Sequence, residues 1–344
     1  MSTRERTARA ALAEAAVAAR HAPSVHNTQP WRWRVEPDAL DLFAVRDRQL
    51  LAGDPDGRLL TLSCGAALHH AVVALAAEGW TAAVSRLPDP ADAEHLARVT
   101  LAGRTEVTGA AMRRFQAVRL RHTDRRPVSE VPADPAPVAA AVAEYGIHLH
   151  VLTRDQVLDL AAAASRADRV ETGDDAQRAE LASWTGGDRP GGTGVPDAAI
   201  PDRAPETTVP GRDFAHAGTL AIGDGHDEAA VYAVLYGPGD EPADWLRAGE
   251  ALSAGWLAAT EAGIAVLPYS SVVELPAIRT ALRNVISGVG YPYLVLRLGT
   301  ADPDAAGPPP TLGCPRARPS RSLVDRMRAC PAWKRTLGRR RRWD

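Results

Sequence analysis

The residues best suited to chemistry stand in the stretch APSVHNTQPWRW near the N-terminus. Its proline favours a rigid turn, and such a turn can expose backbone amides with the short polar side chains of Ser24, His26 and Asn27. The Gln29 amide can donate and accept hydrogen bonds at once. These groups suit the edge of a flat heterocycle that carries both carbonyl and ring N–H groups. A ligand-free polar turn between a helix and a strand is the alternative interpretation.

A second cluster lies in the run RHTDRR, in which Arg121, Thr123 and Arg125 alternate. Two guanidinium groups and a hydroxyl at this spacing can hold a phosphate dianion, because the planar guanidinium binds phosphate oxygens in pairs. His122 stands inside the cluster and is a further candidate. A solvated basic turn is the alternative interpretation.

Hydrophobic periodicity predicts the elements that must position these clusters. It predicts helices over 7–20, 58–80, 107–120, 138–145, 155–184, 243–262 and 275–286, and strands over 31–35, 40–46, 81–87, 97–101, 147–153, 219–222, 230–236, 264–267 and 293–298. Residues 58–80 are apolar on all sides, so this helix is expected at the centre of the molecule. The order of elements repeats along the chain, although no residue-by-residue repeat is visible.

Two motifs resemble segments of a known family. Pro23-Ser-x-x-Asn-x-Gln-Pro-Trp31 resembles the flavin-edge segment of the nitroreductase superfamily, and Arg121-x-Thr-x-Arg125 resembles its Arg-x-Ser-x-Arg phosphate grip. Over roughly residues 8–328 the chain resembles the Acg-like branch, in which two nitroreductase-like halves are fused.

The resemblance implies an α+β, nitroreductase-like fold whose two fused halves form an intramolecular pseudo-dimer with long central helices. The first half is expected over residues 1–120, the second over 121–328, and a basic tail over 329–344. Residues 186–210 are rich in Gly and Pro and too long for a tight connection, which predicts a lid. A monomer then suffices, because the dimer interface is internal.

The resemblance also implies a single FMN, because the phosphate grip occurs in one half and the flavin-edge segment in the other. Leu267-Pro-Tyr-Ser-Ser271 is expected to cover the flavin face. Arg318 and Arg321 are expected to add charge at the phosphate, although serines stand where the family has Arg and Pro. The implied cofactor-binding residues are Pro23, Ser24, Val25, Asn27, Gln29, Arg121, His122, Thr123, Arg125, Pro268, Tyr269, Ser270, Ser271, Arg318 and Arg321.

The function implied is that of an FMN-dependent oxidoreductase, with hydride transfer between NAD(P)H, flavin N5 and a small flat acceptor such as a nitroaromatic or quinone. No protein nucleophile is expected, and donors from Ser24, Asn27 and Gln29 are expected to stabilise charge on the reduced ring. A lid-covered FMN store with little turnover is the first alternative. A structural pseudo-dimer without a cofactor is the second.

Composition limits the remaining function classes. The net charge of −2 argues against a nucleic-acid partner, and the basic tail is interpreted as a solvated segment. Three cysteines without a CxxC pair favour a reducing cytoplasm. The sequence predicts no signal peptide and no membrane span. His148 and His150 share a strand face but lack a third ligand nearby, so no metal site is expected.

Overall fold

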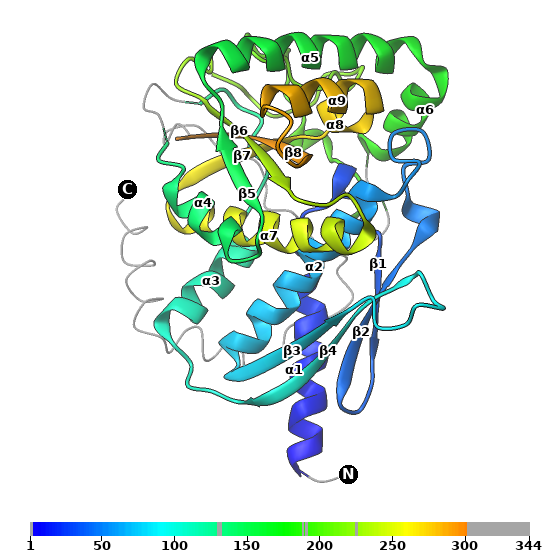
Figure 1. Ribbon diagram of the computed structural model, residues 1–344, viewed down its shortest axis with the longest axis vertical. Helices are drawn as coiled ribbons and strands as arrows, with labels where there is room; N and C mark the ends of the chain where they lie inside the picture. The colour runs from blue at the N-terminus through cyan, green and yellow to red at the C-terminus, as the bar shows by residue number, and fades with distance from the viewer. Residues whose placement is uncertain (1–2, 129–132, 188, 190–191, 224–225, 301–344) are drawn as a thin grey trace.

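The computed structural model describes residues 3–128, 133–187, 189, 192–223 and 226–300. Within these residues two antiparallel four-stranded sheets are covered by helices (Figure 1). The first sheet has the order β1-β2-β4-β3, from β1 (Trp31–Val35), β2 (Ala39–Ala44), β3 (Trp80–Arg86) and β4 (His95–Arg104). The second has the order β5-β6-β8-β7, from β5 (His148–Val151), β6 (Val231–Gly237), β7 (Ile264–Tyr269) and β8 (Tyr291–Thr300). The predicted α+β class is confirmed.

The helices lie around and between the sheets. They are α1 (Thr3–Ala19), α2 (Arg58–Ala77), α3 (Gly109–Leu120), α4 (Ala136–Ala143), α5 (Arg154–Gly173), α6 (Asp175–Trp184), α7 (Pro242–Glu261), α8 (Ser271–Glu274) and α9 (Pro276–Val285), with short 3-10 turns η1 (Val25–Asn27), η2 (Arg46–Arg48) and η4 (Asp197–Ala199). Figure 1 shows the first sheet below, the second sheet above, and α2 and α7 between them.

Both sheets follow the same strand order, in which the first strand pairs with the second, the second with the fourth, and the fourth with the third. Each also has a register shift at the same place, between Leu42 and Phe43 in β2 and between Leu235 and Tyr236 in β6. This shared topology supports the hypothesis of two fused halves.

The two central helices cross in backbone contact. A Cβ atom added at Gly65 of α2 would lie 2.0 Å from the carbonyl oxygen of Leu246, and one added at Gly249 of α7 would lie 1.9 Å from that of Leu62. Glycine is therefore required at both positions, because any side chain would force the helices apart. Figure 1 shows this crossing at the centre of the molecule.

Each central helix also contributes to both hydrophobic cores. Leu246 and Leu257 of α7 belong to the core around α1 and the first sheet, whereas Leu59 and Leu62 of α2 belong to the core of the second sheet. The 18-residue window that makes α2 apolar and long enough to cross a membrane is 89% buried inside the fold. The apolar composition of α2 thus serves the interior of this protein.

Several predicted elements differ from the structure in their bounds, and three differences matter most. The helix predicted over 155–184 is two helices, because Asp174 has extended backbone angles and its carboxylate caps α6. The helix predicted to reach Trp80 ends at Ala77, and Trp80 begins β3. The strand predicted over 219–222 is a single bridge between Pro201 and Leu220. The helix predicted over 275–286 is confirmed as α9, and the short helix α8 before it was not predicted.

Candidate functional site

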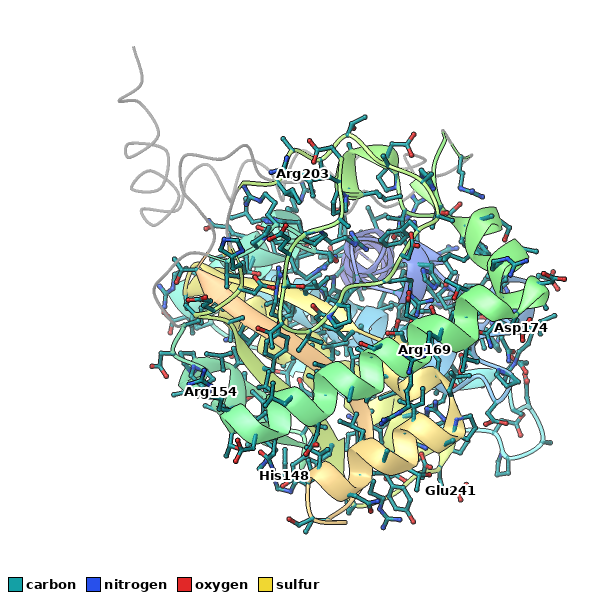
Figure 2. The ribbon with its side chains drawn as sticks, turned by 90° about the horizontal axis from the view of Figure 1, so that it is seen from above. His148, Arg154, Arg169, Asp174, Arg203 and Glu241 are labelled. Carbon is teal, nitrogen blue, oxygen red and sulfur yellow. The ribbon has the colours of Figure 1, made fainter. Side chains whose placement is uncertain are left out.

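A cavity of about 880 Å³ opens where the two central helices meet the second sheet. Its wall combines residues 23–27, the start of α2, residues 121–125, α7, the end of β7 and a long loop that reaches residue 217. Figure 2 looks down on this face, with α5 running from Arg154 toward Asp174 and the loop that carries Arg203 in the same view. This volume lies within the range of ~300–1,000 Å³ that is usual for small-molecule sites.

Residues 23–27 form a strained turn on the cavity wall. His26, Asn27 and the following Gln29 all have positive φ, at 44°, 54° and 49°. Such angles are uncommon for residues with a side chain, and strained backbone concentrates at functional sites. The turn is held against α2, since the backbone amide of Val25 donates to the Ser63 hydroxyl of that helix over 3.2 Å.

Arg121 is a buried cation with spare donors. It follows the last residue of α3 and is only 1% exposed. Its Nη2 donates to the carbonyl of His21 over 3.2 Å, and its guanidinium carbon lies 4.5 Å from the ring centroid of Trp256. Among the described residues its Nε and Nη1 have no hydrogen-bond partner. Burial lowers the pKa of Arg121 to about 9.

Arg125 lines the same cavity, as does Thr123. Its Nη1 donates to the carbonyl of Ala199 over 2.9 Å, and its guanidinium lies 5.2 Å from the ring centroid of Phe214. Burial, and then the nearby positive charge of Arg212, lowers the pKa of Arg125 to about 10. The cavity is therefore lined by two guanidinium groups whose pKa values burial lowers.

The turn that carries these arginines is itself held by buried charges. Arg297 on β8 is 2% exposed and donates to the carbonyls of Asp124 and Arg126, over 2.8 and 2.6 Å. The Nη1 of Arg297 pairs with the Asp227 carboxylate at 2.6 Å. Along the cavity as a whole, six described arginines face two described aspartates. Arg203, Arg212 and Arg297 pair with carboxylates outside this lining, so the charges of Arg121 and Arg125 are the ones that suit an anionic ligand.

Comparison with known proteins identifies the family. A Mycobacterium tuberculosis (strain H37Rv) protein provisionally named NAD(P)H nitroreductase Rv3131 is 41% identical over 301 residues, which cover 84% of this chain and 85% of that protein. The chain belongs to the NAD(P)H nitroreductase family, in its Acg-like branch. The protein named acg from the same strain is 37% identical over 298 residues, covering 84% of this chain and 88% of that protein.

Two further comparisons add less. No protein-family model matches this nitroreductase-family chain. A solved nitroreductase with bound FMN from Bacteroides fragilis is 15% identical, with a TM-score of 0.35, and covers 60% of this chain and 97% of that one. A similarity at that TM-score carries no argument about the present site.

Most of the predicted site residues lie together. The cavity is lined by Pro23, Ser24, Val25, Asn27, Arg121, Thr123, Arg125, Pro268, Tyr269, Ser270 and Ser271. The end of β7 and the start of α8 bring the last four into the cavity wall.

Two predicted site residues that the structure describes, Gln29 and His122, are not on the cavity wall, and two others lie outside the described part of the chain. Gln29 is 3% exposed and donates to the carbonyl of Gly192, so its amide serves the loop. His122 is absent from the wall, and its Nδ1 lies 3.0 Å from the carbonyl oxygen of Leu120. Arg318 and Arg321 fall outside the described residues.

Two of the three side-chain donors expected to face the ring bond to the loop instead. The Asn27 Nδ2 donates to the carbonyls of Gly192 and Gly194 over 2.8 and 3.0 Å, and the Gln29 Nε2 donates to that of Gly192. The Ser24 hydroxyl accepts from the backbone amide of Gln29 over 3.0 Å, which leaves its own proton available to donate. The Asn27 side chain keeps a buried acceptor, because its Oδ1 has no hydrogen-bond partner in the described part of the chain. The wall near Asn27 therefore offers an acceptor where a donor was expected.

Sequence reasoning missed a charged group beside the cavity. Arg212 pairs with Glu171 of α5 and Glu274 of α8, and His26 lies in the same electrostatic environment. Burial, and then Arg212, lowers the pKa of His26 to about 3. A single arginine in a loop without periodicity gives no spacing signal. Glu171, in contrast, continues the buried apolar face of α5, and a carboxylate at such a position indicates a buried partner.

The described residues contain no group of three or more His, Cys, Asp or Glu side chains placed to hold a metal ion. His150 instead lies 3.1 Å from the Gln156 side chain through its Nε2, and His148 packs against Tyr236. These contacts explain both histidines as parts of the β5 surface.

Proposed function

We propose that this protein is an FMN-dependent oxidoreductase of the nitroreductase type. The observation that supports it best is the Arg121 guanidinium, which is buried beside the cavity with two nitrogens that have no partner among the described residues. A buried charge without a counterion is costly, and a bound phosphate would remove that cost. Thr123 and Arg125 line the same cavity.

FMN also fits the opposite part of the cavity. Its phosphate would be held by Arg121, Thr123 and Arg125, and its ring would lie near residues 23–27 and 267–271, which complete the wall. The buried Oδ1 of Asn27 suits a ring N–H, since it is an acceptor without a partner in the described chain. The protein's part is to bind, orient and exclude water, and a bound FMN supplies the two-electron chemistry.

We infer a nicotinamide as the electron donor and a small flat acceptor, such as a nitroaromatic or quinone. The names of the relatives support the donor, since they are provisionally termed NAD(P)H nitroreductases. The proposal assigns no side chain of the cavity wall as a catalytic nucleophile, because the cofactor carries the redox chemistry. Because the two cores share their central helices, we propose that a monomer is sufficient. We also propose that the protein is located in the reducing cytoplasm.

A second function, FMN storage with little turnover, is favoured by one specific observation. The loop that lines the cavity is tied to the opposite wall, where Asn27 and Gln29 donate to carbonyls of Gly192 and Gly194. If this loop acts as a lid and closes over bound FMN, a nicotinamide cannot stack on the ring.

Anaerobic reduction distinguishes these functions. The oxidoreductase predicts that NADH or NADPH bleaches the flavin absorbance band of the FMN-loaded protein rapidly. The store predicts that the band persists with either nicotinamide, although dithionite bleaches it. A cofactor-free structural role predicts colourless protein whose melting temperature does not rise with added FMN.

A further inference from the structure

Residues 192–217, here called the strap, line the cavity over much of its wall. One end of the strap is fixed to the first half by neutral groups. The Asn27 Nδ2 donates to the carbonyls of Gly192 and Gly194, and the amide of Gly194 returns a bond to the carbonyl of Asn27 over 3.1 Å. These bonds carry no net charge, so this anchor is insensitive to pH.

The other end of the strap is fixed by charge. The guanidinium of Arg212, whose side chain is 13% exposed, lies 3.2 Å from a Glu171 oxygen of α5 and bonds to Glu274 of α8. Its Nη2 is also 3.4 Å from the Ser270 hydroxyl. Glu171 keeps one buried oxygen without a hydrogen-bond partner among the described residues. Two buried carboxylates thus face one guanidinium.

The pKa values of the two carboxyl groups that face Arg212 are shifted in opposite directions. Burial, together with facing Glu274 and Asp168, outweighs the attraction of Arg212 and raises the pKa of Glu171 to about 7. Burial alone would raise the pKa of Glu274, but Arg212 outweighs it and the pKa is lowered. His26 stays neutral because burial and Arg212 lower its pKa to about 3. Arg125 adds a more distant positive charge.

We propose that Arg212 is an ionic latch that holds the strap across the cavity and thereby controls how fast FMN enters and leaves. The strap in turn positions Arg125 of the proposed phosphate site. The Ala199 carbonyl of the strap accepts a hydrogen bond from the Arg125 guanidinium, and the Phe214 ring lies beside that guanidinium. Arg212 is therefore a positioning residue. The effect on FMN rests on the function proposed above, whereas the latch itself does not.

The sign of the pH dependence follows from Glu171. Its pKa is about 7 with the strap closed, against an ordinary value of 4.5, so the closed state retains a proton that an open, solvated state releases. The contribution of Glu171 to closure is fully present below its ordinary pKa and is lost as the pH rises toward 7. The strap is consequently better protected at pH 5.5 than at pH 8. Glu171→Gln removes this difference, because glutamine is neutral at both pH values and still accepts from Arg212.

The test is hydrogen–deuterium exchange of strap peptides in the ligand-free, full-length protein, expressed as protection factors at both pH values. Glu171→Gln combined with Glu274→Gln leaves Arg212 without a counterion and should lower strap protection roughly 10-fold or more. Arg212→Gln, which leaves the two carboxylates unpaired, should do the same at pH 8. Asp202→Asn is the matched control, since it removes an exposed ion pair with Arg203 on the same strap and should change nothing.

The same proteins are then loaded with FMN, and its release is followed by fluorescence. Faster release from the double variant than from the wild type and Asp202→Asn supports the latch. Unchanged strap protection in both the double variant and Arg212→Gln overturns the latch, as does wild-type protection that is equal at the two pH values. Failure of every protein to bind FMN refutes the proposed function, while the exchange data still decide whether the latch exists.

Discussion

The Arg121 guanidinium donates to the main-chain oxygen of His21 over 3.2 Å, across a separation of 100 residues. This bond joins the end of α3 to the turn that follows α1. The arginine cluster and the polar turn at residues 23–27 line one cavity. The proposed cofactor site therefore depends on how these two distant segments of the chain are joined.

The first prediction concerns the arginine cluster. Arg121→Ala combined with Arg125→Ala should weaken FMN binding at least about 100-fold, because a charge-assisted hydrogen bond contributes about 1.5–3 kcal/mol. Fluorescence titration measures the affinity, and circular dichroism checks that the fold persists. Arg113→Ala removes an exposed arginine of α3 and serves as the control. Undiminished affinity in the double variant would place the phosphate elsewhere.

The second prediction separates stability from binding at Arg121. Replacing it with methionine removes a desolvated charge but keeps an unbranched apolar stem against Trp256. The free energy of unfolding of the ligand-free protein should stay equal or rise by up to about 2 kcal/mol, while FMN affinity falls. Urea unfolding measures the first quantity. A loss of several kcal/mol would show that Arg121 is a structural residue rather than a binding residue.

The third prediction concerns pH. The pKa values of Arg121 and Arg125 are lowered to about 9 and about 10 in the free protein, so both lose charge as the pH rises past these values. FMN affinity should therefore fall above pH 9, by up to about tenfold per unit for each group that must regain a proton on binding. Titration with riboflavin, which lacks the phosphate, is the control. Parallel pH profiles for FMN and riboflavin would rule out these arginines as the phosphate site.

The fourth prediction concerns the helix crossing. Gly249→Ala would place a Cβ atom 1.9 Å from the Leu62 carbonyl oxygen, so α2 and α7 must separate. We expect a loss of about 1–3 kcal/mol or more in the free energy of unfolding, together with weaker FMN binding because the cavity wall shifts. Gly173→Ala, at the end of α5 with open space around it, is the control. Equal stability of the two variants would mean that the helices do not cross in contact.

Much of the secondary structure was predictable because it follows local patterns. α2 is buried all round, as its uniformly apolar sequence predicted, and β1 occupies the predicted range. The errors arose at positions where one residue changes the local backbone. Asp174 ends one helix and caps the next. The pair Gly173-Asp174 carries a helix-end and N-cap signal, which hydrophobic periodicity does not register.

The site was predictable as two motifs, but their hydrogen-bond partners were not. Residues 23–27 line one cavity together with Arg121, Thr123 and Arg125, as the family resemblance implied. The side-chain amide nitrogens of Asn27 and Gln29 instead donate to the strap, because this segment, more than 160 residues away in sequence, folds back over them. The pairing of Arg212 with Glu171 and Glu274 likewise depends on tertiary structure. Contacts of this kind leave no periodic signal in the sequence.

The most direct measurement is the flavin content of the purified protein after incubation with excess FMN and removal of the free flavin. One cavity that joins a single arginine cluster to a single polar turn predicts one FMN per chain by absorbance. That signal should be lost when Arg121 and Arg125 are both replaced. Two flavins per chain, or none, would contradict this account.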